Sequence, residues 1–323
     1  MKILAVQNRM GIGDMIIFLP FIEAIAKKFD SPVSILVKEN TKSSEILKNN
    51  PHINEIIFLD RNDHAKKGRH FGFRGTLNLA SDIQKYNFDK VFIFNSSLRF
   101  RLIMKIAKIK DIYQYKLFDK KKQNIIKAAQ DFLKRSINLD VESKPTISIS
   151  PKDINEAFLK YNIVKKNINI LLGIGGSGDT KRVAAEKYIE FIKLCTNNYE
   201  CKFFLAAGKK YEEQEILKKI LNSNFKNYCK ALDDLTISET LPIIKNCNLA
   251  VCNDTSFSHL SAALEIETIV LMTDSPLLYG SYSPKMHPII PDGEKTVTHN
   301  TLGKDKINPE KIFNKMKEIL KLS

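Results

Sequence analysis

The sequence has few cysteines, no tryptophan and no long apolar run. Its five cysteines all lie between positions 195 and 252 and form no CxxC pair. It therefore predicts neither a zinc-binding module nor a disulfide-stabilised secreted domain. No stretch reaches the ~18 consecutive apolar residues of a spanning helix. A Gly-Lys-Ser/Thr sequence is also missing, which excludes P-loop chemistry. What remains is the composition of a folded protein, 43% hydrophobic and 27% charged.

Acidic residues are in short supply as well. The chain has 36 Asp and Glu against 51 Lys and Arg, which leaves a formal charge of +15. Such an excess favours polyanionic partners, namely nucleic acid, anionic lipid or phosphorylated sugars. Because the lysines are dispersed, a compositional bias toward Lys, Ile and Asn explains the charge equally well. No RNA- or DNA-binding motif is present, so nucleic acid is not an expected partner.

The start of the chain, Met1 to Val6, imitates a secretory signal. Arg9 and Asp14 interrupt the apolar region, and no small-residue cleavage site follows at the right distance. We therefore expect a cytoplasmic protein and leave open a peripheral contact with the inner membrane surface.

Short β-rich runs alternate with segments of helical spacing in both halves of the chain. The expected strands are 2–7, 33–37, 55–59, 90–95, 169–173, 202–207, 249–253 and 268–272. Strands separated by helices predict parallel sheets that are covered on both faces. We expect an α/β protein of two doubly wound, Rossmann-like domains, 1–150 and 151–323, that face a cleft. The last helix, 309–322, belongs to the second domain or packs back on the first.

Gly11-Ile12-Gly13-Asp14 follows the first expected strand and opens the first helix. The glycines allow a tight turn and leave room for a ligand beside the helix N-terminus. The third glycine of a dinucleotide fingerprint is missing. Asp14 is then either a carboxylate that caps the helix start, or a general base at the carboxyl edge of the sheet.

A second glycine-rich segment, Gly173 to Arg182, follows the first strand of the second domain. It fits G-x-G-x-x-G, but the next strand ends without the Asp or Glu that would hold a ribose 2′-hydroxyl. Its backbone N–H groups, the Ser177 hydroxyl and the cations Lys181 and Arg182 suit a diphosphate without a metal. The alternative is a flexible surface turn with solvated charges.

A dense polar run, Asn253 to His259, follows the buried strand 249–253 and leads into a helix. Hydroxyls and backbone N–H groups at a helix N-terminus bind phosphate, and His259 would be presented to the same anion. A purely structural capping box does not need Asp, Thr, Ser, Ser and His together. We therefore favour a ligand-binding role for this run.

Together these motifs resemble glycosyltransferase family 9, the lipopolysaccharide core heptosyltransferases. The most specific is the run 254–264, which is similar to the family's Asp-Thr-Gly-x-x-His-x-x-Ala-Ala motif. The opening Gly-x-Gly-Asp with Pro20 looks like the family's N-terminal signature, and residues 175–182 resemble its loop ending in Lys-Arg/His-Trp. The sequence departs from the family pattern at Ser256, where Gly is usual, and at Val183, where Trp is common. Both departures concern the donor sugar and leave nucleotide-diphosphate binding intact.

The resemblance implies a glycosyltransferase B fold and an inverting, metal-independent transfer of a heptose or similar sugar from an ADP-sugar, without a cofactor. It implies that Asp14 is the general base and that Lys181 pairs with the donor phosphates. The other donor contacts that it implies are Gly13, Gly176, Ser177, Glu212 on the ribose, Leu235 on adenine, Asp254 toward the sugar, and Thr255, Ser256 and His259 toward the diphosphate.

A basic segment after the third strand is a candidate for binding an anionic, lipid-linked acceptor of the lipopolysaccharide-core type. Arginine and lysine hold carboxylates and phosphates through charge-assisted hydrogen bonds. A solvated loop is the alternative. The candidate residues are Arg61, Lys66, Lys67, Arg69, Arg74 and, after the fourth strand, Arg99.

We therefore predict a glycosyltransferase, and two alternatives stay open. One is a glycosyltransferase B enzyme that uses another donor, such as a uridine or guanosine nucleotide-sugar. The other is a non-catalytic protein of the same fold that binds lipid or nucleic acid through a basic face. The presence of both Asp14 and Lys181 favours catalysis.

Overall fold

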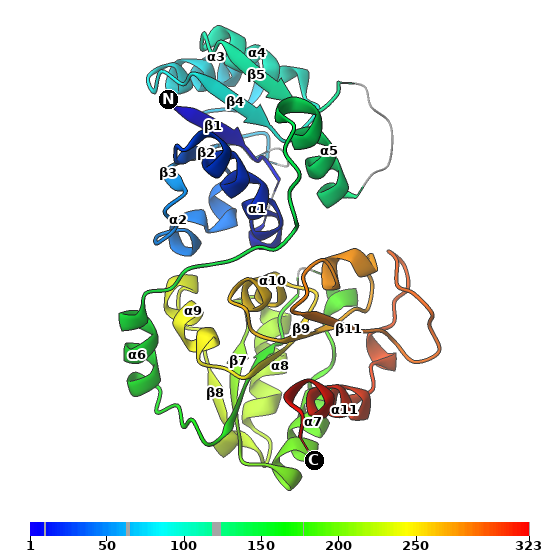
Figure 1. Cartoon of the computed structure of the whole chain (residues 1–323). Helices are drawn as coiled ribbons and strands as arrows, with labels where there is room; N and C mark the ends of the chain where they lie inside the picture. Colours follow the sequence, from blue (N-terminus) through cyan, green and yellow to red (C-terminus); the bar gives the residue numbers. More distant parts are fainter. Residues whose placement is uncertain (10, 63–64, 118–123, 177, 323) are drawn as a thin grey trace. The chain divides into compact units, whose positions relative to one another are not determined.

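The computed structural model describes residues 1–9, 11–62, 65–117, 124–176 and 178–322. The chain divides into two compact units, Met1–Pro145 and Thr146–Ser323, shortly before the predicted boundary. Each unit is built around one parallel β-sheet with helices on both faces (Figure 1). None of the helices that the structure describes is long and apolar enough to cross a membrane.

The sheet of the first unit has the order β3-β2-β1-β4-β5, and every described pairing in it is parallel. The edge strand β5 was not predicted, because its four residues are only partly buried and carry no alternating apolar pattern. The elements of this unit are β1 (Ile3–Val6), α1 (Ile12–Phe29), β2 (Val33–Val37), α2 (Ser43–Ile46), β3 (Ile53–Phe58), α3 (Gly72–Gln84), β4 (Lys90–Ile93), α4 (Leu98–Ile106), β5 (Asp111–Gln114) and α5 (Ile125–Ile137).

Alternate residues of these strands point to opposite faces, so the first sheet has two cores. On one face Leu4, Val6 and Val91 pack with the buried sides of α3 and α4. On the other, aromatic rings join the sheet to α5: Phe94 lies edge-on to Phe132, with ring centroids 5.4 Å apart. The helices are therefore fixed by apolar side chains on both faces of the sheet.

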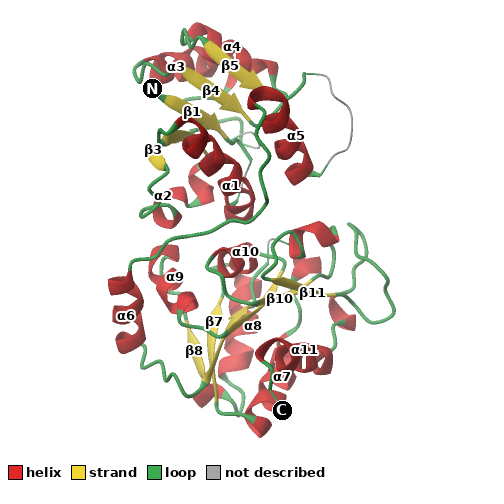
Figure 2. Ribbon diagram, viewed as in Figure 1, coloured by secondary structure: helices red, strands yellow, loops and turns green. Residues whose placement is uncertain are grey.

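The sheet of the second unit has the order β11-β10-β9-β6-β7-β8 and is also parallel. Its strands are yellow in Figure 2. The edge strands β8 and β11 were not predicted. The first has three residues, and the second contains Pro288, which interrupts a strand pattern but is tolerated at a sheet edge. The elements of this unit are α6 (Pro151–Lys160), β6 (Ile168–Gly173), α7 (Ala185–Asn198), β7 (Cys201–Ala206), α8 (Tyr211–Leu221), β8 (Cys229–Ala231), α9 (Ile237–Lys245), β9 (Leu249–Asn253), α10 (Ser256–Ala263), β10 (Thr268–Leu271), β11 (Met286–Ile289) and α11 (Pro309–Leu320).

The last helix, α11, packs within the second unit. It lies against α7, and its Ile312 and Met316 belong to that unit's core. The apolar face of α11 is therefore occupied there, where the sequence had also allowed packing on the first domain.

The order of the strands indicates where each of the two sheets is expected to bind a ligand. In each sheet the first strand of the unit, β1 or β6, pairs with both the second and the fourth strand. The chain therefore leaves the sheet toward opposite faces at these two neighbours, which opens a crevice at their carboxyl ends. The glycine segment at 11–14 follows β1, the glycine-rich segment 173–182 begins at the end of β6, and the polar run 253–259 begins at the end of β9.

Candidate active site

Asp14 lies in the first turn of α1, directly beyond β1. The helix begins after Gly11, whose φ of +104° belongs to the region that favours glycine. No side-chain hydrogen bond among the described residues caps the start of α1, but the negative charge of Asp14 in the first turn suits the helix dipole. The carboxylate is 20% exposed and its Oδ1 lies 3.7 Å from Arg9 Nη1. Burial raises the pKa of Asp14 and Arg9 opposes the rise, which leaves a carboxylate of increased basicity.

Two further polar residues of this edge were not predicted. Gln7 follows β1 and is 1% exposed, yet neither polar atom of its side chain has a described partner. Tyr115 follows β5, and its buried hydroxyl also lacks a described partner. Buried polar groups are normally satisfied, so such orphans mark a position where a ligand's polar group can bind. Gln7 was counted in the sequence only as the end of a buried strand.

In the second unit a single buried carboxylate organises two glycine turns. Glu213 in α8 accepts hydrogen bonds from Gly176 N (3.2 Å) and from Gly208 N (2.5 Å). A Cβ at Gly175 or at Gly208 would lie 2.5 Å or 2.7 Å from Glu213 Oε2. A side chain at either position would therefore displace the Glu213 carboxylate from the N–H groups that it accepts from. The sequence pattern predicted the glycine turns but did not identify the Glu213 carboxylate that lies between them.

Asn253, the last residue of β9, holds the same loop from the opposite side. Its Nδ2 donates to Ile174 O and to Gly175 O, both at 3.0 Å. Its Oδ1 accepts from the Tyr188 hydroxyl at 2.8 Å. Arg182 is buried too and donates to Gly176 O at 3.0 Å. The described part of this loop is thus fixed by buried hydrogen bonds, which does not fit a flexible surface turn with solvated charges.

Lys181 and Asp254 meet at the carboxyl ends of β6 and β9. Lys181 Nζ donates to Asp254 Oδ2 at 2.6 Å, and Ser275 Oγ donates to the same oxygen at 2.5 Å. His259 Nε2 lies 3.9 Å from Asp254 Oδ1. Burial alone would raise the pKa of Asp254, but Lys181, His259 and Ser275 together outweigh it and lower that pKa. Asp254 is therefore a carboxylate, and it holds the ammonium group of Lys181 at the crevice.

The start of α10 supplies neutral hydrogen-bonding groups beside this ion pair. Burial lowers the pKa of His259, which favours its neutral form, and its Nδ1 lies 3.0 Å from the Tyr282 hydroxyl. Thr255 is the N-cap residue, and its buried hydroxyl has no described partner. Ser256 is half-buried as the first residue of α10. The predicted diphosphate contacts thus gather at one helix N-terminus.

The other predicted donor contacts differ in their exposure and in the element that carries them. Glu212 is exposed in the first turn of α8, beside the buried Glu213. Leu235 is half-buried in the loop between β8 and α9. Gly13 lies in the first turn of α1, in the first unit, while Ser177 lies outside the described residues. Val183, at the position where the family often has Trp, is buried in the core of the second unit.

The two adjacent glutamates can be separated by experiment. Glu213→Gln should lower the free energy of unfolding by about 1–3 kcal/mol, because one glycine N–H then faces an amide NH₂ instead of an oxygen. Glu212→Gln should leave the unfolding free energy within ~0.5 kcal/mol of the wild-type value, because that side chain is exposed. Urea unfolding of both variants measures this difference. Equal destabilisation would contradict the clamping role of Glu213.

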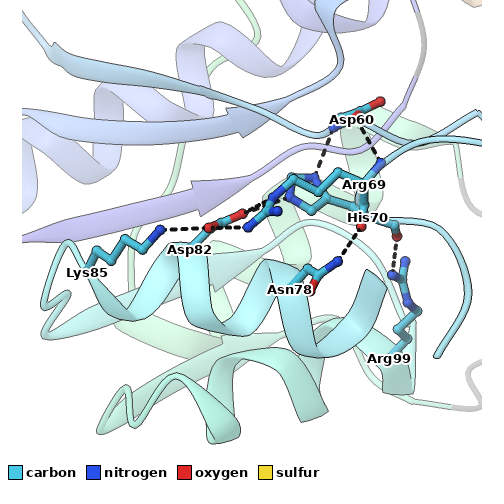
Figure 3. A network of polar contacts seen from close by, with 7 residues as sticks. All are labelled: Asp60, Arg69, His70, Asn78, Asp82, Lys85 and Arg99. Atoms are coloured by element: carbon cyan, nitrogen blue, oxygen red, sulfur yellow. Dashed lines mark hydrogen bonds and ion pairs between the residues drawn. The ribbon is translucent and has the colours of Figure 1, made fainter. Parts of the chain in front are cut away.

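Two of the predicted acceptor residues are engaged inside the first unit, in the network of Figure 3. Arg69 makes a bidentate pair with Asp82, Nε–Oδ2 at 2.9 Å and Nη2–Oδ1 at 3.0 Å. Arg99 Nε donates to Thr76 Oγ1 at 2.9 Å, and its Nη2 donates to His70 O at 2.5 Å. These guanidinium groups hold the loop that precedes α3 against α3 and α4. Their predicted contact with an acceptor would have to be made beside these bonds.

Three of the four remaining basic candidates are exposed. Lys66 and Lys67 are exposed in a loop that the backbone closes with two hydrogen bonds between Asn62 and Lys67. Arg74 is exposed on the first turn of α3, and Arg61 is half-buried. The structure thus separates Arg69 and Arg99, whose guanidinium groups are bonded to the loop and helices of this unit, from the exposed Lys66, Lys67 and Arg74.

Possible metal ligands do not cluster in the ranges that the structure describes. No group of three or more His, Cys, Asp or Glu side chains is arranged there to hold an ion. The five cysteines are free thiols, four of them buried.

Comparisons with known proteins agree with this architecture. Residues 79–311 match the family model of glycosyltransferase family 9 (heptosyltransferase). A lipopolysaccharide heptosyltransferase 1 of Campylobacter coli is 24% identical, with 99% of each chain covered. Among solved structures, a family 9 glycosyl transferase of Veillonella parvula has a TM-score of 0.79 at 18% identity and covers 100% of this chain and 98% of its own. The E. coli ADP-heptose lipopolysaccharide heptosyltransferase II has a TM-score of 0.74 at 17% identity and covers 99% and 98%. Since the family model spans well over half of the 323 residues, this chain belongs to glycosyltransferase family 9 and is a glycosyltransferase.

Proposed function

We propose that this enzyme transfers a heptose, or a similar sugar, from an ADP-sugar to an anionic acceptor of the lipopolysaccharide-core type. The observation that carries the proposal is the ion pair of Lys181 with Asp254 beside the open N-terminus of α10. A cation, backbone N–H groups and the unpartnered Thr255 hydroxyl converge there, at the position where α/β sheets bind nucleotides. The relatives named above, one of them an ADP-heptose enzyme, favour heptose and adenine among the nucleotide-sugars.

In the proposed reaction the second unit binds the donor. Lys181 and the start of α10 hold the diphosphate, and Asp254 accepts a hydrogen bond from a sugar hydroxyl. Glu212 holds the ribose and Leu235 packs on the adenine. The positive charge of Lys181 and the N–H groups of α10 stabilise the leaving diphosphate, which is the work that a metal ion does in other transferases. We therefore propose a metal-independent transfer.

The first unit supplies the base and the acceptor site. Asp14 removes the proton of the attacking hydroxyl as its oxygen bonds to the anomeric carbon from the face opposite the diphosphate, which inverts that carbon. The bond from the anomeric carbon to the diphosphate oxygen breaks in the same step. Lys66, Lys67 and Arg74 would bind acidic groups of the acceptor. We place the reaction at the cytoplasmic face of the inner membrane, where a lipid-linked acceptor would be met.

A panel of nucleotide-sugars tests the proposal against a uridine or guanosine donor. The true donor nucleotide should stabilise the folded state by about 2.7 kcal/mol at a hundredfold excess over its Kd, seen as a rise in the midpoint of thermal unfolding. We expect ADP and ADP-heptose to give that rise, and sugar transfer to continue in EDTA. Stabilisation by a uridine or guanosine nucleotide alone would favour the second donor class. Binding without transfer to any acceptor would favour the non-catalytic alternative.

A further inference from the structure

Helix α4 carries an apolar stripe on its exposed side. Leu98, Leu102 and Ile106 follow one another at intervals of four residues and are 55%, 49% and 38% exposed. Residues at this spacing line up along one side of a helix. The buried side of α4 is formed by other residues, Phe100, Ile103 and Met104. The exposed stripe is therefore additional to the apolar side that the fold of this unit uses.

The neighbouring helix α3 extends this surface. Its first two turns expose Phe73 (78%) and Leu77 (46%). The bond from Arg99 to Thr76 shows which sides of α3 and α4 face each other. At 3.6 residues per turn, Phe73 lies about 60° around α3 from Thr76, and Ile106 and Leu102 lie about 20° and 60° around α4 from Arg99. Leu77 and Leu98 lie about 100° around their helices from Thr76 and Arg99. Phe73, Leu102 and Ile106 therefore border the contact between the helices, and Leu77 and Leu98 lie next to them on the exposed sides; we call these five residues the α3–α4 patch.

Cations lie beside this patch, and the carboxylate of its helices lies away from it. Arg101, Lys105 and Lys108 come from α4 and its C-terminal end, and the two lysines are exposed without an ion pair to any described residue. The one carboxylate in the sequences of α3 and α4 is Asp82. It is turned away from the α4 side of α3, where it binds Arg69, His70 and Lys85 (Figure 3). Within α3 and α4, the charged side chains beside the patch are therefore cations.

We propose that the α3–α4 patch docks on an anionic lipid bilayer, with Phe73, Leu77, Leu98, Leu102 and Ile106 entering the interface and Lys105 and Lys108 contacting lipid headgroups. Interfacial helices combine these two features, an apolar side that enters the headgroup region and cations that contact anionic lipid. The proposal goes beyond the transfer reaction and does not depend on which sugar is transferred.

Charge separates this partner from a second copy of the chain. A symmetric contact between two patches would place the lysines of one copy against those of the other, and the chain already carries a formal charge of +15. An anionic surface instead neutralises these cations. The position of the patch also suits a lipid-linked acceptor. Phe73 and Leu98 lie in the first turns of α3 and α4, which begin at the same carboxyl edge of the sheet as Asp14.

The experiment measures sedimentation of the full chain with vesicles. Wild-type protein should bind vesicles of phosphatidylcholine with phosphatidylglycerol, bind phosphatidylcholine alone at least tenfold more weakly, and lose affinity as salt is raised. Phe73→Ser/Leu102→Ser should weaken binding at least tenfold. Lys105→Gln/Lys108→Gln should weaken it by about fivefold for each cation at low salt. Because all four side chains are exposed, the thermal unfolding midpoint should stay at the wild-type value.

Matched controls lie in the second unit. Leu159→Ser/Val164→Ser removes two exposed apolar residues, and Lys193→Gln/Lys218→Gln removes two exposed cations. Both should bind vesicles within about twofold of wild type, and all variants should transfer sugar to a soluble, lipid-free acceptor as before. Unchanged vesicle binding in either patch variant, or an equal loss in its control, would overturn the proposal. So would wild-type self-association that both patch variants abolish, because that result assigns the patch to a second copy. Lost transfer to every acceptor in the wild type would instead count against the proposed function alone.

Discussion

Asp14→Asn is expected to reduce turnover by about 10²–10⁴-fold while the protein stays folded. The replacement keeps the shape of the side chain but cannot accept the proton of the attacking hydroxyl. Asp30→Asn is a matched control, because Asp30 ends the same helix in a left-handed conformation that asparagine also adopts. It should leave turnover unchanged. Turnover retained by Asp14→Asn would remove Asp14 as the base.

The pH dependence gives a second readout of the same carboxylate. The base acts when ionised, so kcat/KM should fall as the pH drops through the pKa of Asp14. Burial raises that pKa above its ordinary value, and Arg9 opposes the rise. Arg9→Gln should therefore shift the acidic limb of the profile toward higher pH. A profile that does not move would show that Arg9 does not act through Asp14.

Lys181→Ala is expected to lower kcat by about 10²–10³-fold, because the leaving diphosphate loses the cation that stabilises it. The same change leaves Asp254 buried at the crevice without its ammonium partner, at a cost of about 1–3 kcal/mol in unfolding free energy. Isothermal titration with ADP and steady-state kinetics measure the first effect, and urea unfolding measures the second. Lys181→Arg should recover part of the rate because it keeps the charge. Unchanged kinetics in Lys181→Ala would exclude a role with the diphosphate.

The sign of the pH effect on stability follows from Asp254. Its pKa is lower in the folded than in the unfolded state. The stabilisation is therefore present above the unfolded pKa of about 4 and is lost as the pH falls through the folded pKa. Since Lys181 is the chief cause of the lowering, Lys181→Ala should reduce this loss of stability on acidification. Adding Asp254→Asn to Lys181→Ala should restore part of the stability, since no unpaired charge then remains.

The sequence was sufficient for the central strands of both sheets and for the edge strand β3, but not for the other three edge strands. Central strands such as β1, β6 and β9 are buried, mostly apolar runs, and their pattern is visible without any partner. The edge strands β5, β8 and β11 owe their form to the neighbour that they pair with. A local sequence pattern does not show which strand a segment pairs with, and β5, β8 and β11 were therefore not predicted.

The candidate site shows the same division. Lys181 was found in the glycine-rich segment and Asp254 and His259 in the polar run after β9, and the structure brings these two motifs into one cluster. Glu213 was missed because its partners are backbone N–H groups of two distant turns, which leave no side-chain signal. For the predicted acceptor residues of the basic loop, the sequence did not reveal the ion pairs that some of them form. A charge count cannot show that Arg69 forms a bidentate pair with Asp82 while staying exposed like Lys67.

The carboxylate between the two glycine turns also has an evolutionary consequence. Alanine at Gly175 or at Gly208 collides with Glu213 Oε2, so either substitution alone is harmful while Glu213 stays. A shorter residue at 213 removes the collision but also removes the acceptor for two N–H groups. The three positions should therefore vary as a set among relatives of this chain, and a selection for suppressors of Gly208→Ala should return changes at 213.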